Sequence, residues 1–384
     1  MKKYLAAAAA FCIMASAAFA QGKVVKIGVY EPLSGDNGAP GKQEALGIRY
    51  AMSLTPTVEL PDGTYTVELV YADNQSSTDK APSAAQHLVS EGVSAVIGAA
   101  GSAVTIAASP YFAEAGIPAV TATSTNPQVT LGNTHYFRVC FLDPFQGVVL
   151  ANYAYKDMGA RTAYCIAELG NDYDVGLVHY FEEAFKALGG EVISDTFPNG
   201  NSDFTSYFAN ALNYKADVFF FPVAVAYSTQ IIAQASSNGY TIPLLGSDIL
   251  DSNKVVEIMK GTNLSLVIST YYQEGAAPYF DDGFRAWLHT DSELITTNGG
   301  NDVITNTSAM GFDAYNVVIE AIKAAGSIEP KKINEALWGV VHEGASGHIE
   351  FDEIGDAIRD SAILKKANTE TGLWEFLKVQ KIEQ

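Results

Sequence analysis

The feature that most constrains this chain is an alternation of two local patterns, which begins at Val24 and repeats along the sequence. Short runs rich in β-branched residues predict strands, and segments with apolar residues three or four positions apart predict helices. The first series predicts strands at 26–30, 65–71, 94–98 and 119–123, with helices at 43–53, 81–91 and 105–115. Strands that alternate with helices pair in parallel, and the helices cover both faces of the sheet. The predicted fold class is therefore α/β, with a doubly wound parallel sheet.

A second series of the same kind begins after Phe145. It predicts strands at 162–167, 191–197, 216–221 and 242–245, separated by helices at 175–188, 204–212 and 228–237. The sequence has 384 residues, 48% of them hydrophobic, which is enough to bury a core in each of two lobes. Because no Gly/Ser tract separates the two series, we expect short ordered crossings that act as a hinge. Parallel sheets bind ligands at the carboxyl ends of their strands, so two facing lobes form a binding cleft.

The charge balance argues against two classes of partner. The chain has 23 Lys and Arg residues against 43 Asp and Glu residues, which gives a formal net charge of −20. A surface of this sign repels nucleic acid and anionic membranes. We therefore expect neither of them as a partner.

The first twenty residues have the order of a secretory signal peptide. Two lysines are followed by an apolar run and by Ala18-Phe19-Ala20, which predicts cleavage before Gln21. A buried N-terminal helix is the alternative. Cys12 lies inside the apolar run and not directly after the cleavage site, so we expect a soluble extracytoplasmic protein without a lipid anchor. The two remaining cysteines, Cys140 and Cys165, are expected either to form a disulfide or to be two buried thiols.

One further stretch, 92–113, carries no charge and is long enough to cross a bilayer. Glycine, serine, threonine and proline residues interrupt it. We therefore interpret it as a strand, a turn and a helix.

Small and hydroxylated residues follow two strands of the first lobe. Ser102 stands in a loop of small residues that leads into a helix, where backbone N–H groups and the serine hydroxyl can bind a carboxylate. The alternative is that Ser102 only caps this helix. Thr123 and Thr125 follow at the end of the next strand, and their hydroxyls can accept from an ammonium and donate to a carboxylate. Ordinary turn chemistry explains these threonines equally well.

The second lobe has two candidates after its own strands. Asp248 follows Gly246 and Ser247 at a strand end, where it can serve as the buried counter-charge of a ligand amine. Tyr173 lies in a loop before a helix and can close over a ligand with its ring and hydroxyl. The alternatives are a solvated or capping role for Asp248 and plain loop packing for Tyr173.

Catalytic motifs are absent from the sequence. It contains no Gly-x-Ser-x-Gly, Walker loop, His-Glu-x-x-His or Gly-x-Gly-x-x-Gly motif, and its six histidines are scattered. Neither the histidines nor the cysteines have the spacing of zinc ligands. We expect binding without chemistry, and neither a cofactor nor a metal.

Short motifs occur in a fixed order over nearly the whole chain after the leader. They are Pro32-Leu33-Ser34-Gly35, Val96-Ile97-Gly98 with Ser102, Gly116-Ile117-Pro118 before Ser124-Thr125-Asn126-Pro127, Tyr136-Phe137-Arg138, Gly311-Phe312-Asp313-Ala314, and Gly347-His348-Ile349-Glu350-Phe351-Asp352-Glu353 with Gly355-Asp356. In this order the chain resembles the type I periplasmic binding proteins of the leucine/isoleucine/valine-binding family. These are soluble receptors of ATP-driven amino-acid importers.

The resemblance implies a division of the chain into two lobes. Three crossings are expected near Cys140–Pro144, Tyr272–Ala277 and Glu343–Gly347. The N-terminal lobe then combines 24–141 with 277–344. The C-terminal lobe combines 145–272 with 348–384.

The resemblance also implies roles for the five candidates. Ser102 and Thr125 hold the α-carboxylate of an amino acid and assist with its amine, and the backbone carbonyl of Thr123 accepts a hydrogen bond. Tyr173 lines the ligand, and Asp248 pairs with the α-ammonium. The side-chain pocket departs from the family, because Pro40 and a small residue near Ala224 stand where aromatic rings are usual. Losing two rings should enlarge the pocket, so leucine specificity does not carry over from the resemblance. A bulkier or more polar amino acid is an alternative.

We expect a monomeric receptor that binds a branched-chain or related amino acid and delivers it to an ABC permease in the membrane. One alternative keeps the fold but binds an amide, a urea-like compound or a small aromatic acid. Another is a sensory receptor. An enzyme is the alternative with the least support in the sequence.

Overall fold

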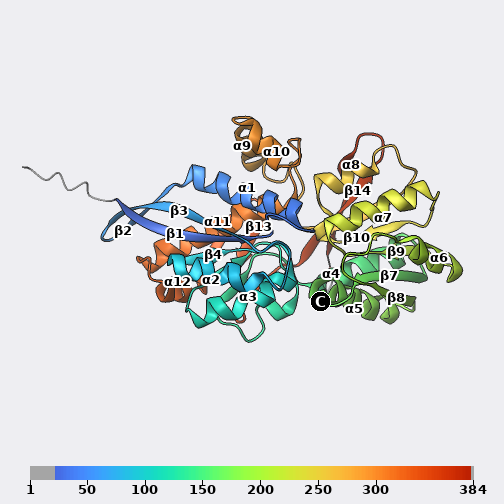
Figure 1. Cartoon of the computed structure of the whole chain (residues 1–384), viewed down its shortest axis with the longest axis horizontal. Coiled ribbons are helices and arrows are strands. Elements are labelled where there is room, and N and C mark those ends of the chain that lie inside the picture. Colours follow the sequence, from blue (N-terminus) through green and yellow to red (C-terminus); the bar gives the residue numbers. More distant parts are fainter. Residues whose placement is uncertain (1–21, 382–384) are drawn as a thin grey trace, which may run out of the picture.

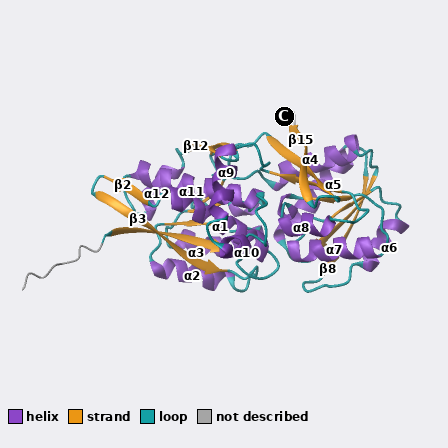
Figure 2. Cartoon of the chain, turned by 90° about the horizontal axis from the view of Figure 1, so that it is seen from above, coloured by secondary structure: helices purple, strands orange, loops and turns teal. Residues whose placement is uncertain are grey.

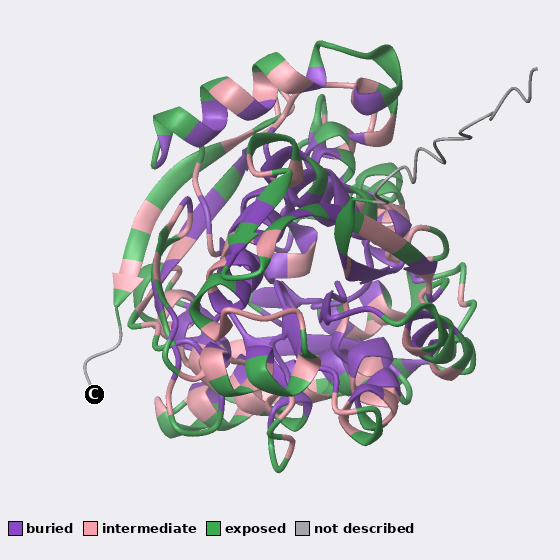
Figure 3. Cartoon of the chain, turned by 90° about the vertical axis from the view of Figure 1, so that its left-hand side faces the viewer, coloured by how far each residue is buried: buried purple, intermediate pink, exposed green. Residues whose placement is uncertain are grey.

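The computed structural model describes residues 22–381 and has two lobes, each built around its own sheet (Figures 1 and 2). Viewed along the long axis, buried residues occupy the strands and the inner helix faces, and exposed residues lie at the periphery (Figure 3). The predicted leader, 1–20, lies outside the described residues. The predicted α/β class with two lobes is confirmed.

The first sheet has the strand order β2-β3-β1-β4-β5-β6. Its strands are β1 (Lys23–Glu31), β2 (Thr57–Leu60), β3 (Gly63–Asp73), β4 (Ala95–Ile97), β5 (Ala119–Thr121) and β6 (Tyr136–Arg138). All neighbours are parallel except β2 and β3, an antiparallel edge pair that the sequence pattern did not predict.

Helices cover both faces of this sheet. Ile27 and Val29 of β1 pack in the core formed with α1 (Gly38–Leu54) and α11 (Asn306–Ala325). Tyr30, one residue on, faces the opposite side. That side is covered by α2 (Ala81–Glu91) and α3 (Ser102–Glu114). The remaining helices of this lobe are α9 (Pro278–Leu288), α10 (Ser292–Thr297) and α12 (Pro330–Leu337).

The second sheet has the order β15-β14-β11-β10-β9-β7-β8. Its strands are β7 (Thr162–Glu168), β8 (Glu191–Phe197), β9 (Val218–Phe220), β10 (Leu244–Gly246), β11 (Leu266–Thr270), β14 (Ser361–Asn368) and β15 (Leu373–Lys381). The five neighbouring strands β11, β10, β9, β7 and β8 are parallel, and β14 and β15 add antiparallel strands at one edge. The helices of this lobe are α4 (Asp143–Asn152), α5 (Asp172–Ala187), α6 (Thr205–Asn213), α7 (Val225–Ser237) and α8 (Asn253–Met259).

The chain passes between the lobes after β6, after β11 and before β14. The third passage lies later than expected, because the residues around Glu343–Gly347 form the turn of a hairpin, β12 (Val341–Gly344) with β13 (Gly347–Glu350). Ile349 and Phe351 beyond it pack in the core of the first lobe.

A buried ion pair holds this segment against the first sheet. Arg138 of β6 contacts Asp356 over 2.7 Å, and both side chains are almost inaccessible to solvent. The residues 348–357, which we assigned to the C-terminal lobe, therefore lie with the N-terminal lobe. The rest of the division, 24–141 plus 277–344 against 145–272 with the end of the chain, stays a proposal.

Helix α1 packs closely against α11 beside the site described below. A side chain at Gly47 would overlap the carbonyl of Ser308, and one at Gly311 would overlap the carbonyl of Glu44. The two helices therefore approach backbone to backbone, which is possible because both residues are glycine. This approach buries Glu44 completely at the inner end of α1.

Three local predictions have structural outcomes. The stretch 92–113 forms β4, a loop and α3, as predicted. Within 22–381, no helix combines the length and the apolar character needed to cross a membrane. Cys140 and Cys165 are both buried free thiols, which decides between the two alternatives left by the sequence.

Candidate ligand-binding site

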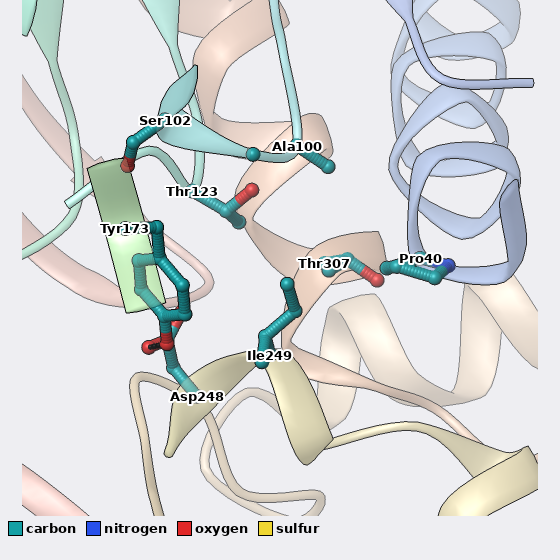
Figure 4. Close-up of a pocket in the computed structure, with 9 residues that line it drawn as sticks. Pro40, Ala100, Ser102, Thr123, Tyr173, Asp248, Ile249 and Thr307 are labelled. Atoms are coloured by element: carbon teal, nitrogen blue, oxygen red, sulfur yellow. Dashed lines mark hydrogen bonds between the residues drawn. The ribbon is translucent and has the colours of Figure 1, made fainter. Parts of the chain in front are cut away.

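A cavity lies between the lobes (Figure 4). Its lining comes from both lobes and consists of Pro40, Ala100, Gly101, Ser102, Thr123, Tyr173, Asp248, Ile249 and Thr307. Most of these residues follow the carboxyl ends of parallel strands or begin helices, which is where open α/β sheets bind ligands.

Ser102 is the first residue of α3, and Gly101 before it has a φ of 114°, which favours glycine. Its hydroxyl oxygen accepts a hydrogen bond from the backbone N–H of Asn126 over 3.2 Å and makes no capping bond to the helix. The alternative that Ser102 only caps the helix is therefore wrong. Its hydroxyl proton is left for a group in the cavity, beside the positive end of α3.

Thr123 lines the cavity next to Ser102, but its hydroxyl proton is already in use. Its Oγ1 donates to Glu44 Oε2 over 2.6 Å. Only the lone pairs of Thr123 Oγ1 are thus available, and they suit a donor such as an ammonium.

Thr125 has a different position from the other candidates. It is fully buried and does not line the cavity. Its backbone carbonyl accepts from the N–H of Asp143 at the start of α4. The structure therefore joins Thr125 to the interlobe crossing and not to the cavity wall.

Asp248 begins a short 3-10 helix, Asp248–Leu250, directly after β10. Its Oδ1 accepts from the Tyr173 hydroxyl and from Gln146 Nε2, each over 2.7 Å. Its Oδ2 accepts from the Tyr271 hydroxyl over 2.9 Å. Burial raises the pKa of Asp248 above its ordinary value, and the three hydrogen bonds oppose this rise because they stabilise the carboxylate.

Tyr173 is held at the amino end of α5 by the side chain of Asn171, whose oxygen accepts from the backbone N–H of Tyr173. The ring lines the cavity, with its hydroxyl toward Asp248 (Figure 4). The hydroxyl lies within 2.7 Å of both Ser247 Oγ and Asp248 Oδ1. This hydroxyl therefore fixes the carboxylate while the ring forms part of the wall.

Sequence reasoning missed four residues of this region. Ile249 and Thr307 line the cavity, and Gln146 and Tyr271 hold Asp248. Tyr271 directly follows β11, so the rule that located Asp248 at a strand end could have located it too. Ile249 and Thr307 carry no comparable signal in the sequence.

The two positions at which we noted missing aromatic rings have different placements. Pro40 lines the cavity from α1. Ala224 is buried in the core of the second lobe and lies outside the described lining.

Hydrogen bonds join the lobes around the cavity. Asn126 Nδ2 donates to the carbonyl of Asp172 over 2.8 Å, and Asn306 Nδ2 donates to the carbonyl of Asp248 over 3.1 Å. The lobes are therefore in contact beside the cavity.

The family model described as periplasmic binding protein matches residues 24–369. The Leu/Ile/Val-binding protein BraC3 of Rhizobium johnstonii is 31% identical over 369 residues, which is 92% of this chain and 93% of that protein. The leucine binding protein LivK of Thermotoga maritima superposes with a TM-score of 0.83 at 33% identity, over 93% of this chain and 99% of LivK. The branched-chain amino acid transporter substrate binding protein LivJ of Streptococcus pneumoniae was solved with isoleucine. It superposes with a TM-score of 0.81 at 25% identity, over 94% of this chain and 100% of LivJ.

Proposed function

This chain belongs to the periplasmic binding protein family, and from that premise we propose that it is an extracytoplasmic receptor for a branched-chain or related α-amino acid. The amino acid binds in the cavity between the lobes. The closed protein then delivers it to an ABC permease. The names of LivK, LivJ and BraC3 support this ligand class.

The observation that carries the proposal is the polarity of the cavity. Asp248 presents a buried carboxylate from one lobe, and Ser102 presents a hydroxyl at the positive end of α3 from the other. A zwitterion fits this arrangement, with its ammonium toward Asp248 and its carboxylate toward Ser102. Thr123 accepts from the ammonium, and Tyr173 covers the ligand. The role of Thr125 remains a prediction.

The rest of the lining supports an aliphatic side chain. Pro40, Ile249 and Thr307 contribute apolar surface and one hydroxyl. This lining matches the polarity of the aliphatic side chains of leucine, isoleucine and valine.

Ligands without an amine are the second candidate class. An amide, a urea-like compound or an aromatic acid would leave Asp248 buried without a cation, which is unfavourable for a charged carboxylate. A sensory receptor would use the same binding chemistry and differ only in the membrane partner.

We propose binding without catalysis. Among the described residues that line the cavity, none is a histidine, cysteine or lysine that could activate Ser102. We also propose that the protein is exported by residues 1–20 and acts as a monomer.

A thermal-shift screen of the twenty amino acids tests the function. The protein is first unfolded and refolded, which removes co-purified ligand. We expect branched-chain amino acids to raise the melting temperature most, because a ligand that binds only the folded state stabilises it. If no amino acid raises it while an aromatic acid or an amide does, the second class of ligand is correct.

A further inference from the structure

Two glutamates lie beneath the cavity without access to solvent. Glu31 ends β1, and Glu44 lies on the inner face of α1 where Gly311 of α11 presses against it. The two carboxyl groups are within hydrogen-bond reach of one another. Neither glutamate forms an ion pair within 22–381.

Each carboxyl group uses one oxygen to hold a residue of the cavity wall. Glu31 Oε2 accepts from the backbone N–H of Ala100 over 2.8 Å. Glu44 Oε2 accepts from the hydroxyl of Thr123 over 2.6 Å. A side chain at Gly98 would overlap the carbonyl of Tyr30 and crowd Glu31 Oε1, so the loop reaches Glu31 because this residue is glycine.

The other oxygen of each group, Oε1, is buried and has no donor among the residues that the structure describes. Two ionised carboxylates in this position would repel one another with no cation to compensate them. One proton between them removes the repulsion and gives each group a partner.

We infer that Glu31 and Glu44 share one proton, and that this pair positions the Ala100 N–H and the Thr123 hydroxyl at the ligand cavity. The functional part of this inference rests on the proposed binding of an amino acid. The two glutamates are positioning residues, because they touch the cavity wall and not the ligand.

The surroundings keep the proton in place at neutral pH. Burial and the charge of Glu44 hold the pKa of Glu31 well above its ordinary value, and burial also raises the pKa of Glu44. Two tyrosines face the pair, Tyr30 from β1 and Tyr136 from β6. Their hydroxyls donate to the carbonyls of Val104 and Gly98, and burial raises both of their pKa values, so both remain neutral.

Loss of the shared proton at alkaline pH should disturb the cavity wall. The two carboxylates then repel one another, and the Ala100 loop and Thr123 move with them. Ligand affinity is therefore fully present below the pKa of the pair in the free protein and falls as the pH rises through it. A binding step coupled to one proton changes affinity by up to about tenfold per pH unit.

Glu31→Gln tests the shared proton directly. The amide oxygen can still accept from Ala100, and the amide N–H can donate to Glu44 without a titratable proton. We expect calorimetry with L-leucine, from about pH 6 to about pH 8.5, where the ligand ammonium keeps its proton, to show a loss of affinity with rising pH in the wild type that Glu31→Gln lacks. The Glu31→Ala variant should bind L-leucine weakly at every pH, whereas the Glu31→Gln variant should retain the affinity that Glu31→Ala loses. Identical pH profiles for the wild type and Glu31→Gln would overturn the inference.

A ligand-free measurement separates this inference from the proposed function. The infrared spectrum of the wild type minus that of Glu31→Gln should contain the carbonyl band of one protonated carboxyl group. Asp313→Asn is the control, because Asp313 is a buried carboxyl of the same lobe that holds Ala345 and Ser346 away from the cavity, and its removal should leave that band. If Glu31→Gln does not fold, Glu44→Gln gives the same test from the other side. Absence of the band would show that Glu31 and Glu44 do not share a proton. Failure of L-leucine to bind the wild type would overturn only the proposed ligand.

Discussion

The two walls of the cavity hold their ligand groups by different means. In the first lobe, Ser102 stands at the end of a helix and presents a neutral hydroxyl beside backbone N–H groups. In the second lobe, Asp248 is a single buried charge fixed by the side chains of Tyr173, Gln146 and Tyr271. The first wall relies on the geometry of its backbone, and the second relies on a charge.

This difference determines what each wall loses on mutation. A neutral donor can be removed at the cost of one hydrogen bond. A buried charge that loses its partner, or a ligand cation that loses its counter-ion, costs more, because an unpaired charge stays in a medium of low polarity. Removal of the charge in the second wall should therefore have a larger effect than removal of a neutral donor in the first wall.

The largest effect is expected from Asp248→Asn. The substitution keeps the shape of the side chain but leaves the ligand ammonium without its anion, so we expect a loss of about 3 to 5 kcal/mol, which is roughly a hundred-fold to several-thousand-fold in affinity. Titration calorimetry with L-leucine measures it. Asp172→Asn is the control, since Asp172 is exposed at the start of the same cleft and its side chain does not line the cavity. Equal affinities in the two variants would remove Asp248 from the site.

Ser102→Ala tests the first wall. It removes one hydroxyl donor to the ligand carboxylate but leaves the end of α3 intact, so we expect a loss of about 1.5 to 3 kcal/mol, smaller than that of Asp248→Asn. Ser109→Ala serves as the matched control, because Ser109 lies on the same helix and its hydroxyl donates to the carbonyl of Ile106. A larger loss for Ser102→Ala than for Asp248→Asn would reverse the comparison between the walls.

Tyr271→Phe tests how the charge of the second wall is maintained. Tyr271 does not line the cavity but donates to Asp248, so its loss raises the pKa of Asp248 further above the ordinary value. Binding needs the ionised carboxylate, so affinity is present above this pKa and is lost as the pH falls through it. In Tyr271→Phe the acid limb of the affinity profile should move to higher pH, with a loss of about 1 kcal/mol at neutral pH.

The neighbouring Tyr272→Phe provides the control for that profile. Tyr272 donates to Asp281 at the second crossing and makes no contact with Asp248. Its substitution should leave the acid limb unchanged. An unshifted acid limb in Tyr271→Phe would mean that the hydrogen bond does not stabilise the charge of Asp248.

Much of the site could be predicted from the sequence, because one rule locates it. In parallel sheets the carboxyl ends of the strands converge, so residues directly after predicted strands are brought together. Ser102, Thr123 and Asp248 all follow this rule, and Tyr173 begins the helix after β7. The rule depends only on local patterns, and local patterns are what a sequence shows directly.

The rest depends on contacts between distant parts of the chain. Residues 348–357 stay with the first lobe because Asp356 pairs with Arg138, which stands more than two hundred positions earlier. Thr125 does not line the cavity, and its carbonyl binds the start of α4 in the crossing. Glu31 and Glu44 meet because glycines let α11 and the β4 loop approach them. None of these contacts has a local signature.

The smallest effect is expected from Ile249→Val, which tests the side-chain end of the cavity where the two walls meet. One methyl group less on the wall makes room for one more on the ligand, and a buried methylene contributes about 0.8 kcal/mol. The ratio of affinities for norleucine over norvaline should therefore rise by about two- to fourfold, measured by calorimetry. Ile231→Val removes the same methyl from the core of the second lobe, outside the cavity lining, and should lower stability without changing that ratio. If Ile249→Val also leaves the ratio unchanged, the ligand side chain does not reach Ile249, and the size of the ligand is set by Pro40 and Thr307 of the first lobe alone.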